Sequence, residues 1–151
     1  MWVFRDIYRR DPDRRAMGLK RVPLPVNLPG VPLGRVPTVT IRGGEVIFRT
    51  TVNVEGAIWT MVFTFSTVYA FRYLEEDHID VSEFLYGVAE VEDSEWVRKL
   101  GDDWVKRYKS QPGRAFGGEP GAVRHYRIVY LENGMYEVVC KNMKLEAFPP
   151  A

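Results

Sequence analysis

A strongly alternating run of apolar and smaller or polar residues covers residues 57–73 and limits the possible folds more than any other feature. Because successive side chains of a β-strand point to opposite faces, a period of two predicts a strand with one aromatic face. This face holds Trp59, Met61, Phe63, Phe65, Tyr69, Phe71 and Tyr73. The run exceeds an ordinary strand. We therefore expect one long bent strand, or two strands broken near residues 66–67, with the aromatic face packed on a helix.

Turn sequences and one helical segment complete the expected fold. Gly43-Gly44 and Asn133-Gly134 each separate two apolar runs and predict β-hairpins. Apolar residues recur at helical spacing over residues 95–108, and Ser94 before them is a favoured N-cap. The pattern predicts an α+β fold, with a mostly antiparallel twisted sheet of about five or six strands. One main helix, residues 94–108, is expected to pack on this sheet.

The chain is expected to have three parts: a basic N-terminal arm (residues 1–22), a proline-rich strap (23–37) and a single α+β domain (38–151). The strap cannot join a central sheet, because proline lacks the amide donor. Its prolines alternate with valines and leucines, which predicts an ordered segment that packs on the domain or on a second copy. Packing on a second copy would make residues 1–37 a homodimerisation device.

The net charge of +1 hides an acidic stretch. Residues 75–95 hold nine acids and neither lysine nor arginine. The stretch is either an ordinary solvated surface or a face that steers association with a basic partner protein. The candidate partner-binding residues are Glu75, Glu76, Asp77, Asp80 and Glu83. Our first hypothesis is accordingly a non-enzymatic protein-binding module.

The basic arm suggests a different class, nucleic-acid binding. Arginine contacts phosphates and aromatic rings stack on bases, and the arm carries Trp2, Phe4 and Tyr8 among its basic residues. The candidate residues are Arg5, Arg9, Arg10, Arg14 and Arg15. The arm's three acids and the near-neutral charge of the whole chain argue against this class, which stays an alternative.

The sequence lacks the motifs of several common catalytic and ligand-binding sites. The sequence has no phosphate-binding loop and no nucleophile elbow. With one cysteine, Cys140, and two histidines, we expect no internal disulfide, no metal site and no cofactor, and a buried structural thiol at Cys140. The longest uncharged run is shorter than the roughly 20 apolar residues of a membrane-spanning helix, and charges interrupt the N-terminus. We expect a soluble, cytoplasmic protein.

His125 with Glu137 is the strongest enzymatic candidate, as a base with an acid. A two-residue turn at Asn133-Gly134 pairs His125 with Asn142 and points Glu137 to the opposite face, which excludes contact. A three-residue turn would place both on one face, although still several residues apart. An enzyme that uses His125 with a carboxylate is therefore a second alternative. A packed histidine at the sheet edge is the competing interpretation, and no catalytic residue is assigned.

A short pattern in the C-terminal half resembles a loose group of small uncharacterised bacterial proteins. It consists of Ser94, Trp96 and Val97, then His125, Tyr126 and Ile128, then Glu137, Val138 and Val139. The resemblance extends over residues 60–145, and some of the group look like immunity proteins of toxin systems. It implies a small binding protein and brings no catalytic residue with it. The marked residues fit structural roles: Ser94 a helix cap, Trp96 a core residue, and His125 and Tyr126 sheet anchors.

Overall fold

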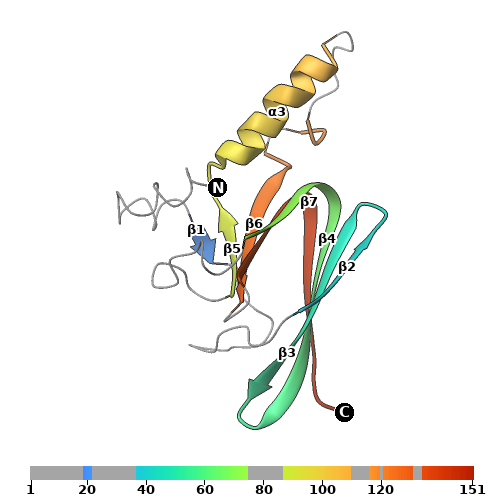
Figure 1. Cartoon of the computed structure of the whole chain (residues 1–151), viewed down its shortest axis with the longest axis vertical. Helices are drawn as coiled ribbons and strands as arrows, with labels where there is room; N and C mark the ends of the chain where they lie inside the picture. The colour runs from blue at the N-terminus through green and yellow to red at the C-terminus, as the bar shows by residue number, and fades with distance from the viewer. Residues whose placement is uncertain (1–18, 22–36, 75–86, 110–115, 120, 131–133) are drawn as a thin grey trace.

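The computed structural model describes residues 19–21, 37–74, 87–109, 116–119, 121–130 and 134–151. Within these ranges the chain forms one antiparallel sheet and one helix, α3 (Glu95–Arg107), as Figure 1 shows. The strands are β1 (Leu19–Arg21), β2 (Thr38–Arg42), β3 (Glu45–Val54), β4 (Ala57–Leu74), β5 (Gly87–Val91), β6 (Arg124–Tyr130) and β7 (Gly134–Phe148). The predicted α+β class is confirmed.

The strands lie in the order β1-β5-β6-β7-β4-β3-β2. Strands β2, β3 and β4 form a meander, and β5, β6 and β7 form a second antiparallel group with α3 inserted between β5 and β6. The pairing of β4 with β7 joins the two groups. Only the three-residue β1, which pairs with β5, has no counterpart among the predicted strands. Three residues are too few to show the alternation of apolar and polar side chains that predicts a strand.

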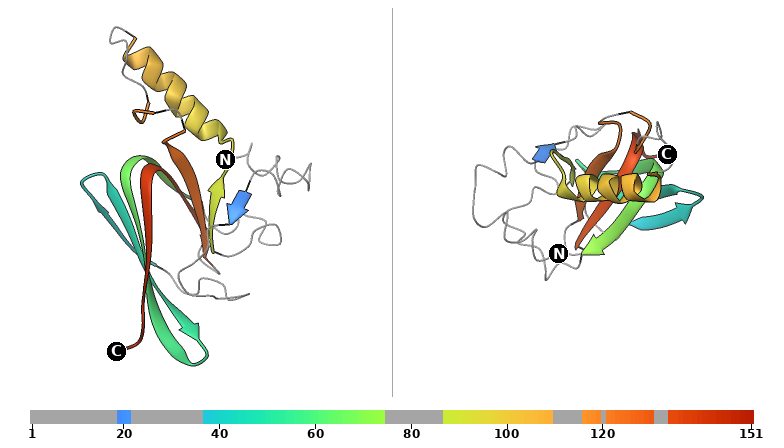
Figure 2. Two further views of the ribbon diagram at one scale, coloured as in Figure 1. Left: turned by 180° about the vertical axis from the view of Figure 1, so that it is seen from behind. Right: turned by 90° about the horizontal axis from the view of Figure 1, so that it is seen from above.

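Strand β4 is one long bent strand, the first of the two alternatives. Its pairing with β7 shifts between Val68 and Ala70, and Thr67 has a φ of 53°. The sheet curls over in this region (Figures 1 and 2), so that residues of non-adjacent strands meet. The rings of Phe65 on β4 and Tyr126 on β6, for example, lie 5.7 Å apart. The curled sheet thereby encloses its own core.

The aromatic face of β4 packs mainly on this core, which corrects the expectation of a helix. Its buried members are Met61, Phe63 and Phe65, which cluster with Phe48 and with residues of β6 and β7. Only Tyr69, at the bend, meets α3, through Trp104 at a ring distance of 6.4 Å. The physical reason is the bend itself, because it lets one half of the sheet cover the other.

Helix α3 starts as predicted. Ser94 has extended backbone angles, and its Oγ accepts a hydrogen bond from the Val97 amide at 3.1 Å. The helix lies across one end of the sheet (Figure 2), and none of its residues is buried. Trp96 and Trp104 carry its ring contacts with the sheet, the first against His125 and the second against Tyr69.

The two-residue turn expected between β6 and β7 is wrong. Tyr130 pairs with Gly134, so three residues separate the strands, and His125 pairs with Val139 rather than with Asn142. Gly134 begins β7 with a φ of 112°, and a Cβ there would collide with the Leu74 carbonyl oxygen. The glycine is therefore required by the close approach of β4, and not by a tight turn.

Candidate functional site

Three charged residues form a row across the centre of the sheet. Arg72 of β4 pairs with Glu137 of β7, and Glu137 pairs with Arg127 of β6. Directly opposed residues share a face, and His125, two positions before Arg127, shares it as well. The apolar core holds the alternate residues of β6, such as Tyr126 and Ile128. The charged row therefore lies on the reverse face from the core.

Glu137 is the centre of this row. Its Oε1 accepts hydrogen bonds from His125 Nε2 at 3.0 Å, from Arg127 Nη2 at 3.0 Å and from Arg127 Nε at 3.2 Å. Its Oε2 accepts one from Arg72 Nε. Glu137, Arg127 and His125 are 0%, 1% and 3% exposed, whereas the Arg72 side chain is one-third exposed. A buried carboxylate is stable here because several charged or polar donors satisfy it.

The surroundings keep Glu137 ionised. Burial alone would raise the pKa of Glu137, because it penalises the charged form. The hydrogen bond from His125 and the positive charges of Arg127 and Arg72 outweigh burial and lower this pKa to about 2. An ionised carboxylate only accepts hydrogen bonds. His125 Nε2 must therefore carry a hydrogen and donate a hydrogen bond to Glu137.

His125 links the sheet to α3, and burial favours its neutral form. Burial lowers the pKa of His125 below its ordinary value, against the opposing influence of Glu137. With the proton on Nε2, the other ring nitrogen, Nδ1, is an acceptor, and the Ser94 hydroxyl at 2.8 Å donates to it. The same Ser94 Oγ accepts from the Val97 amide. A continuous chain of hydrogen bonds thus runs from the first turn of α3 to Glu137.

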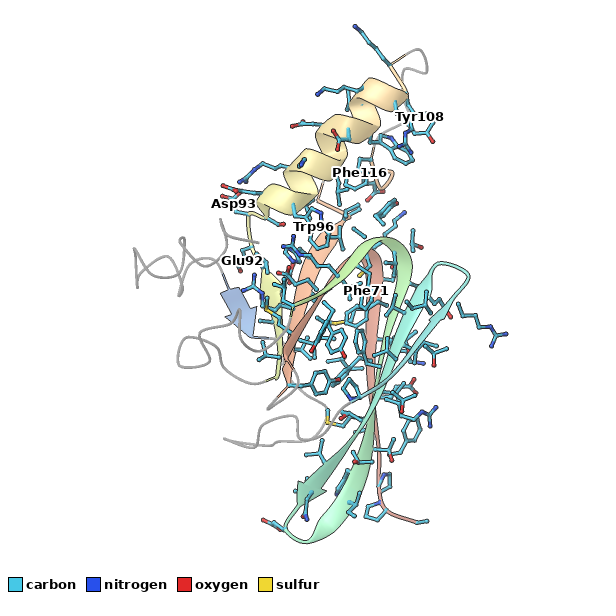
Figure 3. The ribbon with its side chains drawn as sticks, viewed as in Figure 1. Phe71, Glu92, Asp93, Trp96, Tyr108 and Phe116 are labelled. Atoms are coloured by element: carbon cyan, nitrogen blue, oxygen red, sulfur yellow. The ribbon has the colours of Figure 1, made fainter. Side chains whose placement is uncertain are left out.

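Trp96 closes the site from the helix side. Its ring meets the His125 ring edge-on at 5.3 Å and lies 4.1 Å below the guanidinium carbon of Arg72. Figure 3 shows Trp96 on the side of α3 that faces the strands. Glu137 and its partners, together with Trp96 and Ser94, make six residues that we name the Glu137 cluster. Its members are Arg72, Ser94, Trp96, His125, Arg127 and Glu137.

The structure brings together some of the candidate residues predicted from the sequence and leaves others apart. Ser94, Trp96, His125 and Glu137 come together, whereas Tyr126 is buried in the core on the other face. The predicted separation of His125 from Glu137 is wrong, because the register differs. Two other sets lie outside the described residues, together with residues 1–18 and 22–36 of the arm and strap. These sets are Glu75, Glu76, Asp77, Asp80 and Glu83, and Arg5, Arg9, Arg10, Arg14 and Arg15.

Arg72 and Arg127 were not among the candidate residues predicted from the sequence. Each stands in an otherwise apolar or aromatic stretch of strand, with Phe71 and Tyr73 beside Arg72, and Tyr126 and Ile128 beside Arg127. A charged residue within such a stretch is a signal for a buried ion pair, since arginine is rarely buried without a partner. Cys140, by contrast, is buried as predicted, and burial raises the pKa of its thiol to about 12.

Three kinds of feature are absent: a metal site and a membrane-spanning helix among the described residues, and a match to a known protein. Among the residues that the structure describes, no group of three or more histidine, cysteine or acidic side chains could hold a metal ion. The described part of the chain also contains no helix with the length and apolar character needed to cross a bilayer. No family model, curated protein or solved structure matches the chain.

Proposed function

We propose that this protein is a non-enzymatic protein-binding module, cytoplasmic and similar in role to bacterial immunity proteins, whose docking surface lies on α3. One observation carries the proposal. The helix is anchored to the sheet by Ser94 and Trp96 in its first turn, yet none of its residues is buried. Trp104 adds a contact with Tyr69 in the distal half, and a helix held in this way with none of its residues buried suits the helix-in-groove mode of protein recognition.

The surface in question is apolar and ordered. We define the α3 surface by residues that lie on the distal part of the helix or against it, none of them buried. They are Leu100, Trp104, Val105, Tyr108 and Phe116. The Trp104 ring lies 4.4 Å from the Tyr108 ring and 5.8 Å from the Phe116 ring, so the three rings pack together. Figure 3 labels Tyr108 and Phe116 in this region. Val105 is 62% exposed. Pre-positioned aromatic residues dominate binding energy at protein interfaces.

Charged residues surround this surface without filling it. Asp102, Asp103, Lys106 and Arg107 of α3 are all exposed and carry both signs. An apolar centre with a polar rim is the usual anatomy of a protein interface. Because positive and negative residues are mixed here, we expect affinity at this helix to come from shape complementarity and apolar contact rather than from net charge.

The proposal is tested with matched surface variants. Wild type, Val105→Glu and Ile58→Glu are immobilised and exposed to an extract of the source cells, and a retained protein is then purified for calorimetry. Ile58 is a suitable control because it is aliphatic, 59% exposed and situated at the start of β4, away from α3 (Figure 1). We expect Val105→Glu to weaken the Kd at least about tenfold and Ile58→Glu to leave it unchanged. Equal affinities for the three proteins would refute the proposal.

A second candidate, an enzyme that uses His125 with a carboxylate, is supported by the order Ser94, His125, Glu137. The distances of 2.8 Å and 3.0 Å match a nucleophile, a base and an orienting acid, although the two ring nitrogens are exchanged relative to a serine protease. In such a reaction Ser94 Oγ would attack an ester carbonyl carbon while His125 Nδ1 takes the hydroxyl proton. His125 would then return the proton to the departing alkoxide.

The burial of these groups weighs against the second candidate, since Ser94 is only 8% exposed. A fluorophosphonate probe decides between the two. If Ser94 is an active nucleophile, its oxygen bonds to phosphorus, fluoride leaves with the hydroxyl proton, and intact mass spectrometry detects the adduct on wild type but not on Ser94→Ala. An unmodified wild-type protein after prolonged exposure, in native buffer, removes the enzymatic candidate.

A further inference from the structure

His125 joins the sheet to the first turn of α3 through three contacts. Its Nε2 contacts Glu137 of β7, its Nδ1 contacts the N-cap Ser94, and its ring edge packs on Trp96. Two of these three partners belong to the start of α3. The state of one imidazole ring therefore affects the attachment of the helix directly.

We propose that His125 is a proton-sensitive latch, which holds the first turn of α3 on the sheet while its ring is neutral and releases it when the ring gains a second proton. The inference rests on the proposed function in one respect: the α3 surface is what the latch would regulate. The change in helix attachment itself can be measured without any partner.

The second proton has only one place to go. Nε2 already carries a hydrogen, so the proton must bind Nδ1, which then becomes a donor. The Ser94 hydroxyl can no longer donate to it. Ser94 Oγ would have to accept from both His125 Nδ1 and the Val97 amide while turning its own hydrogen elsewhere. The hydrogen bond that joins the helix cap to the sheet is therefore reversed or lost.

The charges around the ring act in both directions: Glu137 favours protonation of His125, whereas Arg127 and Arg72 oppose it. Glu137 on β7 is the one described negative group in contact with the ring, and Arg127 on β6 and Arg72 on β4 already share it. The start of α3 adds a partial positive charge. A protonated ring would raise the excess of positive charge in the buried cluster from one to two. Such an excess is costly in a buried site, so releasing the helix and admitting water becomes favourable.

The composition of the chain makes a clean test possible. His125 and His78 are its two histidines, so His78→Gln leaves His125 as the only imidazole. In His78→Gln, ¹⁵N NMR should find the hydrogen on Nε2 at about pH 7.5 and protonation of Nδ1 as the pH falls below about 6.5. The position of α3 is followed by electron–electron resonance between spin labels at Lys106→Cys and Thr51→Cys, both exposed sites.

The latch predicts a pH-dependent distance between the labels. In the His78→Gln background the distance distribution should shift or broaden between about pH 7.5 and about pH 5. In His125→Gln it should not, because glutamine can donate to Glu137 and accept from Ser94 without titrating. If His125→Gln fails to fold, the His78→Gln titration is still decisive.

Two results would overturn the latch. One is a ring that protonates while the label distances stay the same. The other is a ring that carries its hydrogen on Nδ1 at neutral pH. If the labels respond but the Kd of an α3 partner does not depend on pH, the regulatory role fails and the docking surface stands. If no partner binds α3, the label measurement still judges the latch.

Discussion

The guanidinium carbon of Arg72 lies 4.1 Å from the centre of the Trp96 ring, which places a cation on the face of an indole from another element. Arg72 belongs to β4 and Trp96 to the first turn of α3. The same arginine donates through Nε to Glu137. Arg72 therefore takes part in both the ion pairs of the sheet and the contact between sheet and helix.

A double-mutant cycle should detect the Arg72–Trp96 contact. We expect Arg72→Met and Trp96→Leu to be coupled by about 0.5–2 kcal/mol, because a partly desolvated cation on an aromatic face is attracted by its quadrupole. Urea unfolding of wild type, both single variants and the double variant measures the coupling. Arg98→Met combined with Trp96→Leu is the control, since Arg98 is exposed and pairs with Asp93. Equal coupling in both cycles would contradict the prediction.

Glu137→Gln should be strongly destabilising. The substitution leaves the buried Arg127 without a compensating charge, and breaking a buried pair in this way costs about 3–5 kcal/mol. Glu146→Gln provides the comparison, because Glu146 pairs with Lys144 at 3.5 Å on the surface and such pairs contribute about 0–1 kcal/mol. Chemical denaturation followed by tryptophan fluorescence measures both. Similar costs for the two variants would show that Glu137 is not the electrostatic centre of the site.

Acid should unfold the protein in the range set by Glu137. Its pKa is about 2 in the folded protein, against an ordinary value of 4.5. A lowered folded-state pKa means that the unfolded chain binds the proton first, so stability is complete above about 4.5 and is lost as the pH falls toward 2. Urea midpoints measured through this window should decline in wild type and decline less in Glu137→Gln. Parallel declines would contradict the assignment.

Gly134→Ala should cost far more than Gly121→Ala. Both glycines have positive φ, 112° and 76°, so both substitutions incur backbone strain of about 1–2 kcal/mol. At Gly134 the new Cβ would also collide with the Leu74 carbonyl oxygen and contact the Tyr73 ring, whereas nothing lies within 4 Å at Gly121. Thermal melting compares the two. Equal losses in Tm would mean that β4 and β7 can separate slightly without penalty.

The local patterns of the sequence predicted most of the fold. The alternation over residues 57–73 predicted β4, and Ser94 before an amphipathic stretch predicted α3, because both signals act within a few residues. The contact of His125 with Glu137 escaped prediction. It depends on the role of Gly134, and that role is decided by Leu74, sixty residues earlier in the chain. A local sequence pattern around Gly134 holds no information on how closely β4 approaches it in the folded protein.

Arg72 and Arg127 were not predicted as site residues for a related reason. In an antiparallel sheet one face is often solvated, so a charged residue on an alternating strand ordinarily predicts a surface position. Both faces of the sheet are buried around Glu137, with Ile128 and Val138 on one face and Arg127 and Val139 on the other. Only the position of the helix and the curl of the sheet reveal that Arg127 is interior.

The pairing of β4 with β7 has a consequence for how the chain reaches its native state. Strands β2, β3 and β4 can form from neighbouring segments, but β4 and β7 meet only after a long loop has closed, so we expect their association to be the slow step. Until then two long apolar strand edges stay open to wrong partners. Arg72 belongs to the first group of strands and Glu137 to the second. A register slip of one residue would turn Arg72 or Glu137 to the opposite face and break their ion pair. The ion pair therefore disfavours a misregistered pairing of β4 with β7 at the stage when the open edges could aggregate.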